Sequence, residues 1–352
     1  MQKHGGDIYT YMEQFGERPL DFSASLNPLG LPAEVRERLA DTAGLEAYPD
    51  IACRELKKAV GAAENLPAEW LYFGNGAADL IDRICYAFSP DCALLPAPTF
   101  SEYERALKAS GCSRIIFSPF RRENGFRMDP DFAQQIRQGT DIVFFCNPNN
   151  PTGCVEKPEH LLPVLRVCAE KGALMVLDEC FNDFLDEPSQ YTMKPWLREF
   201  PNLIILKAFT KIYAMAGLRL GYCICADPSV LAKLSQAGQP WNVSTIAQQA
   251  GLAALDAGGY RADTASLIRQ ERQYLREALQ KLGLTVYGSM ANFLFFYAGQ
   301  ADLEKKLLPE GILLRSCAGF YGLEPGFYRA AVRTHAENIR LIESLEKILS
   351  TR

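Results

Sequence analysis

The chain has 352 residues, of which 48% are hydrophobic and 22% are charged, and its formal net charge is -5. This length exceeds what one hydrophobic core usually covers, so two domains are expected. The acidic balance, without any Lys/Arg-rich run, argues against nucleic acid as a partner. No apolar stretch approaches the roughly 20 residues of a membrane-spanning helix, which argues against a membrane partner as well.

Cysteine and histidine usage indicates a reducing compartment and no metal site. The eleven cysteines are odd in number and scattered, with no C-x-x-C pair, which argues against a disulfide framework or a zinc site. The three histidines, His4, His160 and His335, are far apart in the sequence, so no metal centre is expected. The first residues lack the apolar segment of a signal peptide, and we therefore expect a cytoplasmic protein.

In chain order, residues 1–40 are rich in Gly, Pro and polar side chains and are interpreted as an extended N-terminal arm. From about residue 50 to 230, continuous apolar runs alternate with helical patterns, which is typical of strands buried on both faces of a mostly parallel α/β sheet. We assign residues 41–245 to a large domain with a seven-stranded sheet. Its strands are expected at 70–73, 93–96, 114–117, 141–146, 173–178, 203–206 and 220–225.

The remaining residues, 246–352, predict a smaller α+β domain. A long helical pattern runs from about Ser244 to Leu282, and a final amphipathic helix begins near Ala336. Between them lie strand-like segments at 291–297, 312–315 and 328–332.

Candidate ligand-binding residues follow the strands, because ligands bind beyond the carboxyl ends of strands in open α/β sheets. After the first strand, Gly74-Asn75-Gly76-Ala77-Ala78-Asp79 opens a helix. Small residues and a helix N-terminus can hold a phosphate there. The segment matches neither a P-loop nor G-x-G-x-x-G, so a plain tight turn is an equal alternative.

Two further strand ends carry polar residues. Asn147-Pro148-Asn149-Asn150-Pro151-Thr152-Gly153 forms a rigid turn, and simple turn chemistry is favoured for Asn147 and Asn149. Asp178 follows a buried strand, where a carboxylate is costly without a partner. A pyridinium nitrogen would supply that partner, and a helix N-cap is the alternative.

Lys211 lies just beyond an apolar run that begins at Asn202, and Arg219 lies in a second apolar stretch. Desolvation lowers the pKa of an amine, which then can be neutral and nucleophilic near pH 7, as a Schiff-base lysine for pyridoxal phosphate requires. Arg219 could bind a phosphate bidentately. Taken alone, Lys211 fits a surface lysine slightly better, and an ordinary structural salt bridge is the default interpretation of Arg219.

The order of these signals resembles the aspartate-aminotransferase-like, fold type I pyridoxal-phosphate enzymes. The resemblance covers nearly the whole chain and is to the branch of histidinol-phosphate aminotransferases and threonine-phosphate decarboxylases. It implies a homodimer in which Lys211 forms the Schiff base, Asp178 binds the ring nitrogen of pyridoxal phosphate and Asn150 lies near ring O3′. It also implies phosphate contacts from Arg219, Thr210, Gly76, Ala77 and Ala78, ring stacking by Phe100, and a contact of Tyr48 with the phosphate in the partner subunit.

Several segments resemble the threonine-phosphate decarboxylases of cobalamin synthesis in particular, namely 4–6, 20–30, 239–244, 314–318 and 328–333. This resemblance implies a phosphorylated amino-acid substrate, and two arginines suit a substrate with both a carboxylate and a phosphate. The implied substrate residues are His4, Gly5, Ser25, Asn150, Arg315 and Arg329.

Phe181 favours decarboxylation, because related aminotransferases usually carry a tyrosine there that binds O3′. Two positions depart from the decarboxylase pattern. Ser25 stands where an asparagine is expected, and Ala208 replaces a hydroxyl residue, which would cost one phosphate hydrogen bond.

The resemblance implies decarboxylation of L-threonine O-3-phosphate to (R)-1-amino-2-propanol O-2-phosphate. A histidinol-phosphate or related amino-acid aminotransferase is the nearest alternative. A nucleotide-binding Rossmann protein or a non-catalytic binding module is the alternative of another class.

Overall fold

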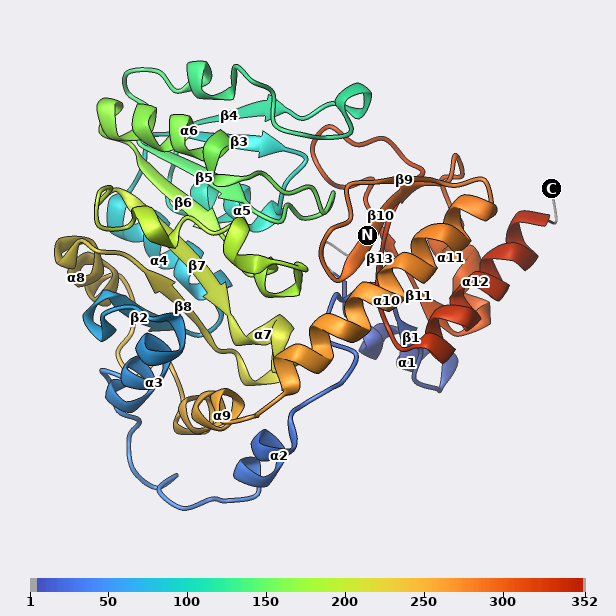
Figure 1. Ribbon diagram of the computed structural model, residues 1–352, viewed down its shortest axis with the longest axis horizontal. Helices are drawn as coiled ribbons and strands as arrows, with labels where there is room; N and C mark the ends of the chain where they lie inside the picture. The colour runs from blue at the N-terminus through green and yellow to red at the C-terminus, as the bar shows by residue number, and fades with distance from the viewer. Residues whose placement is uncertain (1–4, 351–352) are drawn as a thin grey trace.

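The computed structural model describes residues 5–350, and its larger part is built on a seven-stranded sheet (Figure 1). Only β8 runs antiparallel to its neighbours β2 and β7, so the prediction of a mostly parallel sheet is confirmed. In spatial order the strands are β2 (Leu71–Gly74), β8 (Gly221–Ile224), β7 (Leu203–Ala208), β6 (Leu174–Asp178), β5 (Ile142–Cys146), β3 (Cys92–Ala97) and β4 (Arg114–Pro119).

Helices cover both faces of this sheet, which explains the continuous apolar runs. On β5, Phe144 packs in one hydrophobic cluster, and its neighbours Val143 and Phe145 pack in the other. The Phe144 side is covered by α4 (Ala77–Phe88), α5 (Ser101–Ala109) and α8 (Pro228–Gln236), and the opposite side by α3 (Arg54–Glu64) and α6 (Pro158–Lys171).

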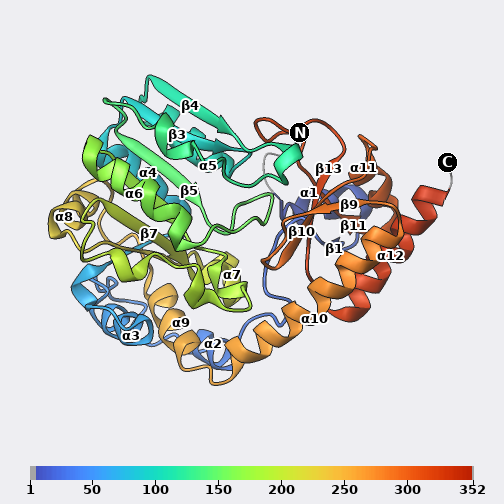
Figure 2. The same cartoon turned by 45° about the horizontal axis from the view of Figure 1, so that its top comes forward.

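The C-terminal part holds a four-stranded antiparallel sheet in the order β12-β13-β10-β9 (Figure 2). A separate parallel pair joins β1 of the N-terminal arm to β11. The strands are β12 (Arg315–Ser316), β13 (Phe327–Ala331), β10 (Phe293–Tyr297), β9 (Thr285–Tyr287), β1 (Leu20–Asp21) and β11 (Ile312–Leu313). The helices of this part are α10 (Tyr260–Lys281), α11 (Leu303–Leu307) and α12 (His335–Ser350).

Two sequence-based expectations need correction. The N-terminal arm is not simply extended, because it contains α1 (Ile8–Phe15) and α2 (Ala33–Leu39). The Asp7 side chain caps α1 by accepting a hydrogen bond from the Thr10 amide, and Gly16 ends it in the left-handed conformation. The single helical region expected after Ser244 is broken into α9 (Thr245–Leu255) and α10 at Gly259, whose φ is 78°.

Helix α9 packs against α2 and α3 beside the large sheet, whereas α10 extends from there toward the small sheet (Figures 1 and 2). The domain limits at residues 40 and 245 stay predictions. Short 3₁₀ helices connect the larger elements: η1 (Ala68–Trp70), η2 (Arg122–Asn124), η3 (Phe132–Gln135), η4 (Asn182–Phe184), η5 (Pro188–Gln190), η6 (Lys194–Trp196), η7 (Ala216–Leu218) and η8 (Leu308–Glu310).

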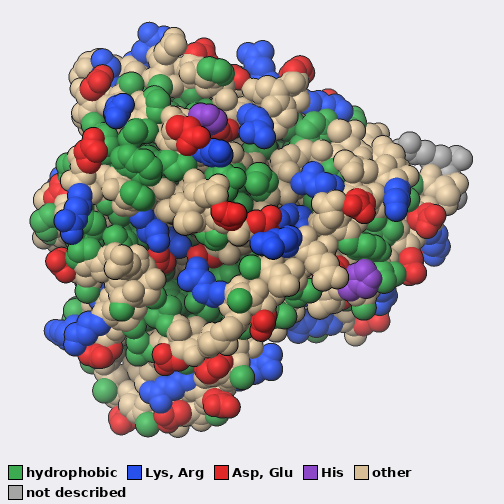
Figure 3. All heavy atoms as spheres, in the orientation of Figure 1, with side chains coloured by type: hydrophobic (Ala, Val, Ile, Leu, Met, Phe, Trp, Pro, Cys, Tyr) green, Lys and Arg blue, Asp and Glu red, His purple; other side chains and the backbone are tan. Residues whose placement is uncertain are grey.

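On the face drawn in Figure 3, basic and acidic side chains are interspersed rather than gathered by sign. Within residues 5–350, none of the helices has the length and apolar character that crossing a bilayer requires.

Candidate active site

A cavity of about 220 Å³ lies where β5, β6 and β7 end, between the large sheet and the small one. The structure brings together most of the predicted site residues here, although they come from distant parts of the chain. Its walls include Gly5, Ala77, Ala78, Phe100, Asn150, Asp178, Thr210, Lys211, Arg219, Arg315 and Arg329.

Lys211 reaches this cavity from α7 (Phe209–Ile212), the short helix that directly follows β7. Desolvation, aided by the positive charge of Arg329, lowers the pKa of Lys211 to about 8. A substantial fraction of the amine is therefore neutral near physiological pH, which is the form that attacks a carbonyl. The Lys211 Nζ lies 5.8 Å from the ring centroid of Phe181.

A second buried lysine, Lys207, has the opposite character. Its Nζ lies 3.2 Å from Asp183 Oδ1 and 3.3 Å from Glu64 Oε1. Burial alone would lower the pKa of Lys207, but these two carboxylates raise that pKa above its usual value. Lys207 thus stays protonated, and of these two lysines only Lys211 is suited to act as a nucleophile.

Asp178, at the end of β6, is buried and accepts two hydrogen bonds. Its Oδ1 accepts from the Cys180 amide at 3.0 Å, and its Oδ2 accepts from the Tyr103 hydroxyl at 2.7 Å. Asp178 does not cap the following helix η4, whose N-cap is Phe181, and its carboxylate lines the cavity, as a partner of a ring nitrogen must. The sequence did not indicate Tyr103.

The glycine turn at Gly76 lies against Arg219, which lines the cavity. Gly76 has φ 84°, and a Cβ built on it would lie 2.7 Å from Nη2 of Arg219. Arg219 itself takes the left-handed conformation, with φ 59°, and forms no salt bridge among residues 5–350. An arginine guanidinium beside a helix N-terminus fits an anion such as a phosphate.

Asp79 contributes to this turn, although from the sequence it was noted only as a departure from the G-x-G-x-x-G pattern. Its Oδ2 accepts hydrogen bonds from the Asn75 amide and from Asn242 Nδ2, both at 2.9 Å. The buried Arg83 lies 3.1 Å away and balances the carboxylate charge near the proposed phosphate position.

The three asparagines after β5 divide as expected. Asn147 and Asn149 are buried and stabilise the turn itself. Asn147 Nδ2 donates a hydrogen bond to the Glu156 carbonyl and Asn149 Nδ2 donates one to the Pro98 carbonyl, both at 2.9 Å. Asn150 faces the cavity, and its Oδ1 accepts a hydrogen bond from Nη1 of Arg329.

Arg315 and Arg329 are opposite each other on the neighbouring strands β12 and β13. Arg329 is buried, and its Nη2 donates to the Ser23 carbonyl at 2.8 Å, whereas its Nε has no hydrogen-bond partner among the described residues. Burial lowers the pKa of Arg329 to about 10 and also lowers that of Arg315. Two facing cations at a cavity predict a ligand with anionic groups.

The remaining predicted contacts have mixed outcomes. Gly5 lines the cavity, but Ser25 does not: it is buried, and its Oγ has no partner among the described residues. His4 lies outside the described residues. Arg333, the last residue of the segment 328–333, forms a salt bridge of 2.7 Å with Glu337 of α12 and is not part of the cavity wall.

Tyr48 lies on the surface, 80% exposed, and stacks on Trp241 with ring centroids 4.6 Å apart. It does not line the cavity of its own chain, so its predicted role in a partner subunit stays a prediction.

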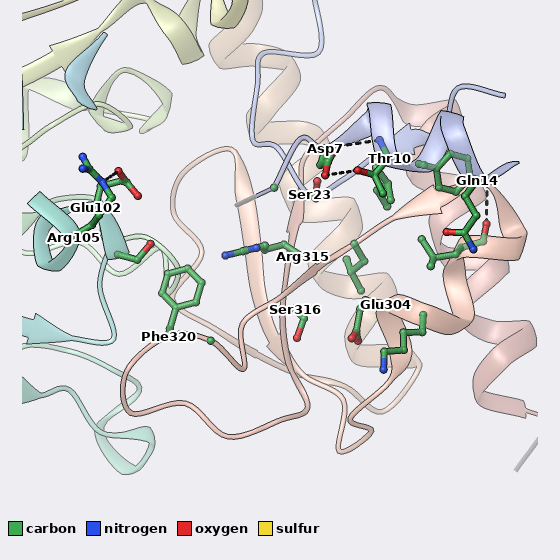
Figure 4. Close-up of a pocket in the computed structure, with 18 of the residues that line it drawn as sticks. Asp7, Thr10, Gln14, Ser23, Glu102, Arg105, Glu304, Arg315, Ser316 and Phe320 are labelled. Atoms are coloured by element: carbon green, nitrogen blue, oxygen red, sulfur yellow. Dashed lines mark hydrogen bonds and ion pairs between the residues drawn. The ribbon is translucent and has the colours of Figure 1, made fainter. Parts of the chain in front are cut away.

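A larger cavity of about 720 Å³ adjoins the first and shares Gly5, Ser23, Ser101, Arg315 and Phe320 with it. Figure 4 shows Arg315 pointing toward the side of this cavity where Phe320 and the α5 residue Glu102 lie. The guanidinium carbon of Arg315 is 5.5 Å from the ring centroid of Phe320. These two residues therefore stand at the junction of the two cavities.

Comparison with known proteins assigns the chain to a family. The family model described as aminotransferase class I and II matches residues 17–345. The chain belongs to this family. Membership confirms the predicted fold type I architecture and the expectation that this aminotransferase-family enzyme uses pyridoxal phosphate.

Two relatives of this family member carry different activities. The chain is 35% identical to the threonine-phosphate decarboxylase of Salmonella typhimurium over 99% of its length and 96% of that protein. It is 36% identical to the histidinol-phosphate aminotransferase of Symbiobacterium thermophilum over 92% of its length and 88% of that protein. Sequence identity therefore establishes the family and leaves the reaction open.

Solved structures agree with the fold. The histidinol-phosphate aminotransferase from Clostridium acetobutylicum superposes with a TM-score of 0.87 at 29% identity, over 95% of this chain and all of that one. The L-threonine-O-3-phosphate decarboxylase from Porphyromonas gingivalis gives a TM-score of 0.82 at 23% identity, over 94% of this chain and 99% of that one.

The cavity of this aminotransferase-family chain fits pyridoxal phosphate on its own geometry. The Gly76 turn leaves no room for a Cβ next to Arg219, as a close approach of backbone to phosphate requires. A lysine of lowered pKa and a buried strand-end carboxylate face the same space. These residues therefore suit the phosphate, the aldehyde and the ring nitrogen of pyridoxal phosphate.

Proposed function

We propose that this enzyme decarboxylates L-threonine O-3-phosphate to (R)-1-amino-2-propanol O-2-phosphate with pyridoxal phosphate as cofactor. The product suits the aminopropanol arm of cobalamin biosynthesis. The all-thiol state of the eleven cysteines supports a cytoplasmic location for the reaction.

The observation that carries the proposal is the phenyl ring of Phe181 beside Lys211. Phe181 is buried and packs edge-on against Phe293, with ring centroids 5.0 Å apart. The aminotransferases that this chain resembles usually place a tyrosine hydroxyl there. The absence of this hydroxyl at Phe181 favours decarboxylation over amino transfer.

We assign the cofactor contacts as follows. Lys211 attaches the cofactor aldehyde, Asp178 binds the ring nitrogen and Phe100 stacks on the ring. Arg219, Thr210 and the amides of Gly76, Ala77 and Ala78 hold the phosphate. When bound, pyridoxal phosphate supplies an electron sink for the bond broken at the substrate Cα.

The chain's own residues select which bond breaks. Arg315 and Arg329 lie opposite each other on β12 and β13, both line the cavity, and they bind the two anionic groups of the substrate. Binding energy from the remote phosphate would orient the substrate carboxylate for release. Asn150 fixes Arg329 in place, and Lys211 returns a proton to Cα.

We further propose a homodimer in which Tyr48 contacts the phosphate of the partner's site. Tyr48 and Trp241 form an exposed aromatic pair, and Ile51 is exposed in the same arm-to-α3 region. Such apolar exposure is typical of subunit interfaces. The larger cavity next to Arg315 would serve as the route by which the substrate enters.

The deciding experiment measures two products from one purified preparation. Threonine phosphate and serine phosphate are supplied separately, and CO2 release is followed alongside amino transfer to 2-oxoglutarate. The proposal expects CO2 release from threonine phosphate and no 2-oxoglutarate-dependent turnover. Amino transfer without CO2, or turnover of histidinol phosphate with 2-oxoglutarate, would show an aminotransferase instead.

A further inference from the structure

The buried tyrosine of α5 links two residues to which cofactor contacts are assigned. The Tyr103 hydroxyl donates to Asp178 Oδ2 at 2.7 Å, and the tyrosine is fully buried. Its ring stacks on Phe144 with centroids 5.0 Å apart and meets Phe100 edge-on at 5.6 Å. Packing on two sides thus fixes the direction in which the hydroxyl points.

The hydroxyl is held in its donor form. Desolvation and the neighbouring Asp178 carboxylate raise the pKa of Tyr103 well above its usual value. Together with the Cys180 amide on Oδ1, Tyr103 gives Asp178 one donor on each carboxylate oxygen. Donors of this kind stabilise the ionised form of a carboxylate and make it a weaker base.

We propose that Tyr103 is a positioning residue that orients Asp178 and donates a hydrogen bond to its carboxylate, so that the proton shared with the cofactor ring nitrogen stays on the ring. If the carboxylate were more basic, this proton would move toward Asp178 and the ring would become neutral. A neutral ring accepts electrons less well, so the hydrogen bond acts on the rate of bond breaking and not on substrate binding. This inference rests on the proposed contact of Asp178 with the ring nitrogen.

The test uses Tyr103→Phe in the full-length enzyme loaded with pyridoxal phosphate labelled with ¹⁵N in the ring. The variant keeps the stacking on Phe144 and removes only the hydroxyl. We expect the ring-nitrogen ¹⁵N shift to move toward that of neutral pyridine and kcat to fall on the order of 10-fold, with KM within about twofold of wild type.

Tyr222→Phe is the matched control, because the buried Tyr222 hydroxyl also donates to a carboxylate, Glu64, at 2.6 Å and lies outside the cofactor cavity. This control should change stability without moving the ring-nitrogen signal. An unchanged signal in Tyr103→Phe would overturn the inference.

Two further measurements keep the outcome clear. If Tyr103→Phe fails to fold, 3-fluorotyrosine can replace Tyr103, because it retains the shape and strengthens the hydrogen-bond donor. The ¹⁵N shift should then move away from that of neutral pyridine, and the inference fails if it does not. In Asp178→Asn the ring-nitrogen signal should shift more than in Tyr103→Phe. No shift in Asp178→Asn would refute the assigned cofactor contact itself, which separates that failure from a failure of the Tyr103 role.

Discussion

The glycine turn at the start of α4 allows a sharp test of how the phosphate is held. In Gly76→Ala, the new Cβ would lie 2.7 Å from Nη2 and 3.2 Å from Cζ of Arg219. Because the far end of an arginine can move, we expect the fold to survive while Arg219 leaves its position. The perturbation therefore acts on the proposed phosphate site rather than on the core.

Two contributions set the magnitude. The φ of 84° at Gly76 is a region that side chains rarely adopt, which costs about 1–3 kcal/mol of folding stability in the variant. Loss of one charged hydrogen-bond donor to the phosphate costs about 1.5–3 kcal/mol, which weakens cofactor binding roughly 10- to 100-fold. The affinity is measured by titrating the apoenzyme with pyridoxal phosphate.

Gly172→Ala provides the control. Gly172 ends α6 with φ 72°, and a Cβ built on it meets nothing within 4 Å. This variant should lose about 1–2 kcal/mol of stability through left-handed strain and bind the cofactor as wild type does. The reasoning would be refuted if Gly76→Ala bound pyridoxal phosphate within about threefold of wild type, or if both variants weakened binding equally.

Five other predictions concern the two lysines, an acidic partner and the reaction. Lys211→Ala should abolish the visible absorbance band of the lysine-bound cofactor, and a surviving band would disprove the assignment. Since the pKa of Lys211 is about 8, covalent attachment of pyridoxal phosphate to the apoenzyme should accelerate as the pH rises to about 8 and then level off, as stopped-flow absorbance would show. Lys207→Met should destabilise the fold by about 1.5–3 kcal/mol in urea unfolding, because two buried carboxylates each lose one of their cationic partners, Glu64 keeping Lys194 and Asp183 keeping Arg261. Lys207 and Lys194 lower the pKa of Glu64 to about 2 from its usual 4.5, against the effect of burial. The stabilisation that Glu64 provides is therefore present above about pH 5 and is lost as the pH falls toward 2. Glu64→Gln should flatten this acid limb of the stability curve. Phe181→Tyr should raise the ratio of amino transfer to CO2 release, and an unchanged ratio would count against Phe181 as the selecting residue.

The sequence predicted well those features that depend on neighbours along the chain. Buried parallel strands leave continuous apolar runs, so all seven strands of the large sheet were located to within a few residues. The short helix α1 was missed, although its N-cap Asp7 and its terminal Gly16 were visible as signals. Strand β9 was missed because it has only three residues, none of them fully buried.

Contacts between residues that lie far apart in the chain could not be predicted from the sequence. The Asn150–Arg329 and Tyr103–Asp178 hydrogen bonds join residues 179 and 75 positions apart. Nothing in the local pattern around Tyr103 distinguishes it from an ordinary core aromatic on an amphipathic helix. Resemblance to a family can point to residues with familiar roles, but it did not indicate which side chain holds Asp178.

The two buried lysines show why local pattern alone could not assign the nucleophile. Lys207 lies within the apolar run and is the more deeply buried, so desolvation alone would make it the better candidate. Asp183 and Glu64 reverse that order, because a lysine between two carboxylates keeps its proton. Lys211 has Arg329 nearby instead, and this cation comes from the other sheet. The proton affinity of each lysine is therefore set by residues that only the folded chain brings near, and neutralising Arg329 should raise the pKa of Lys211 while leaving that of Lys207 unchanged.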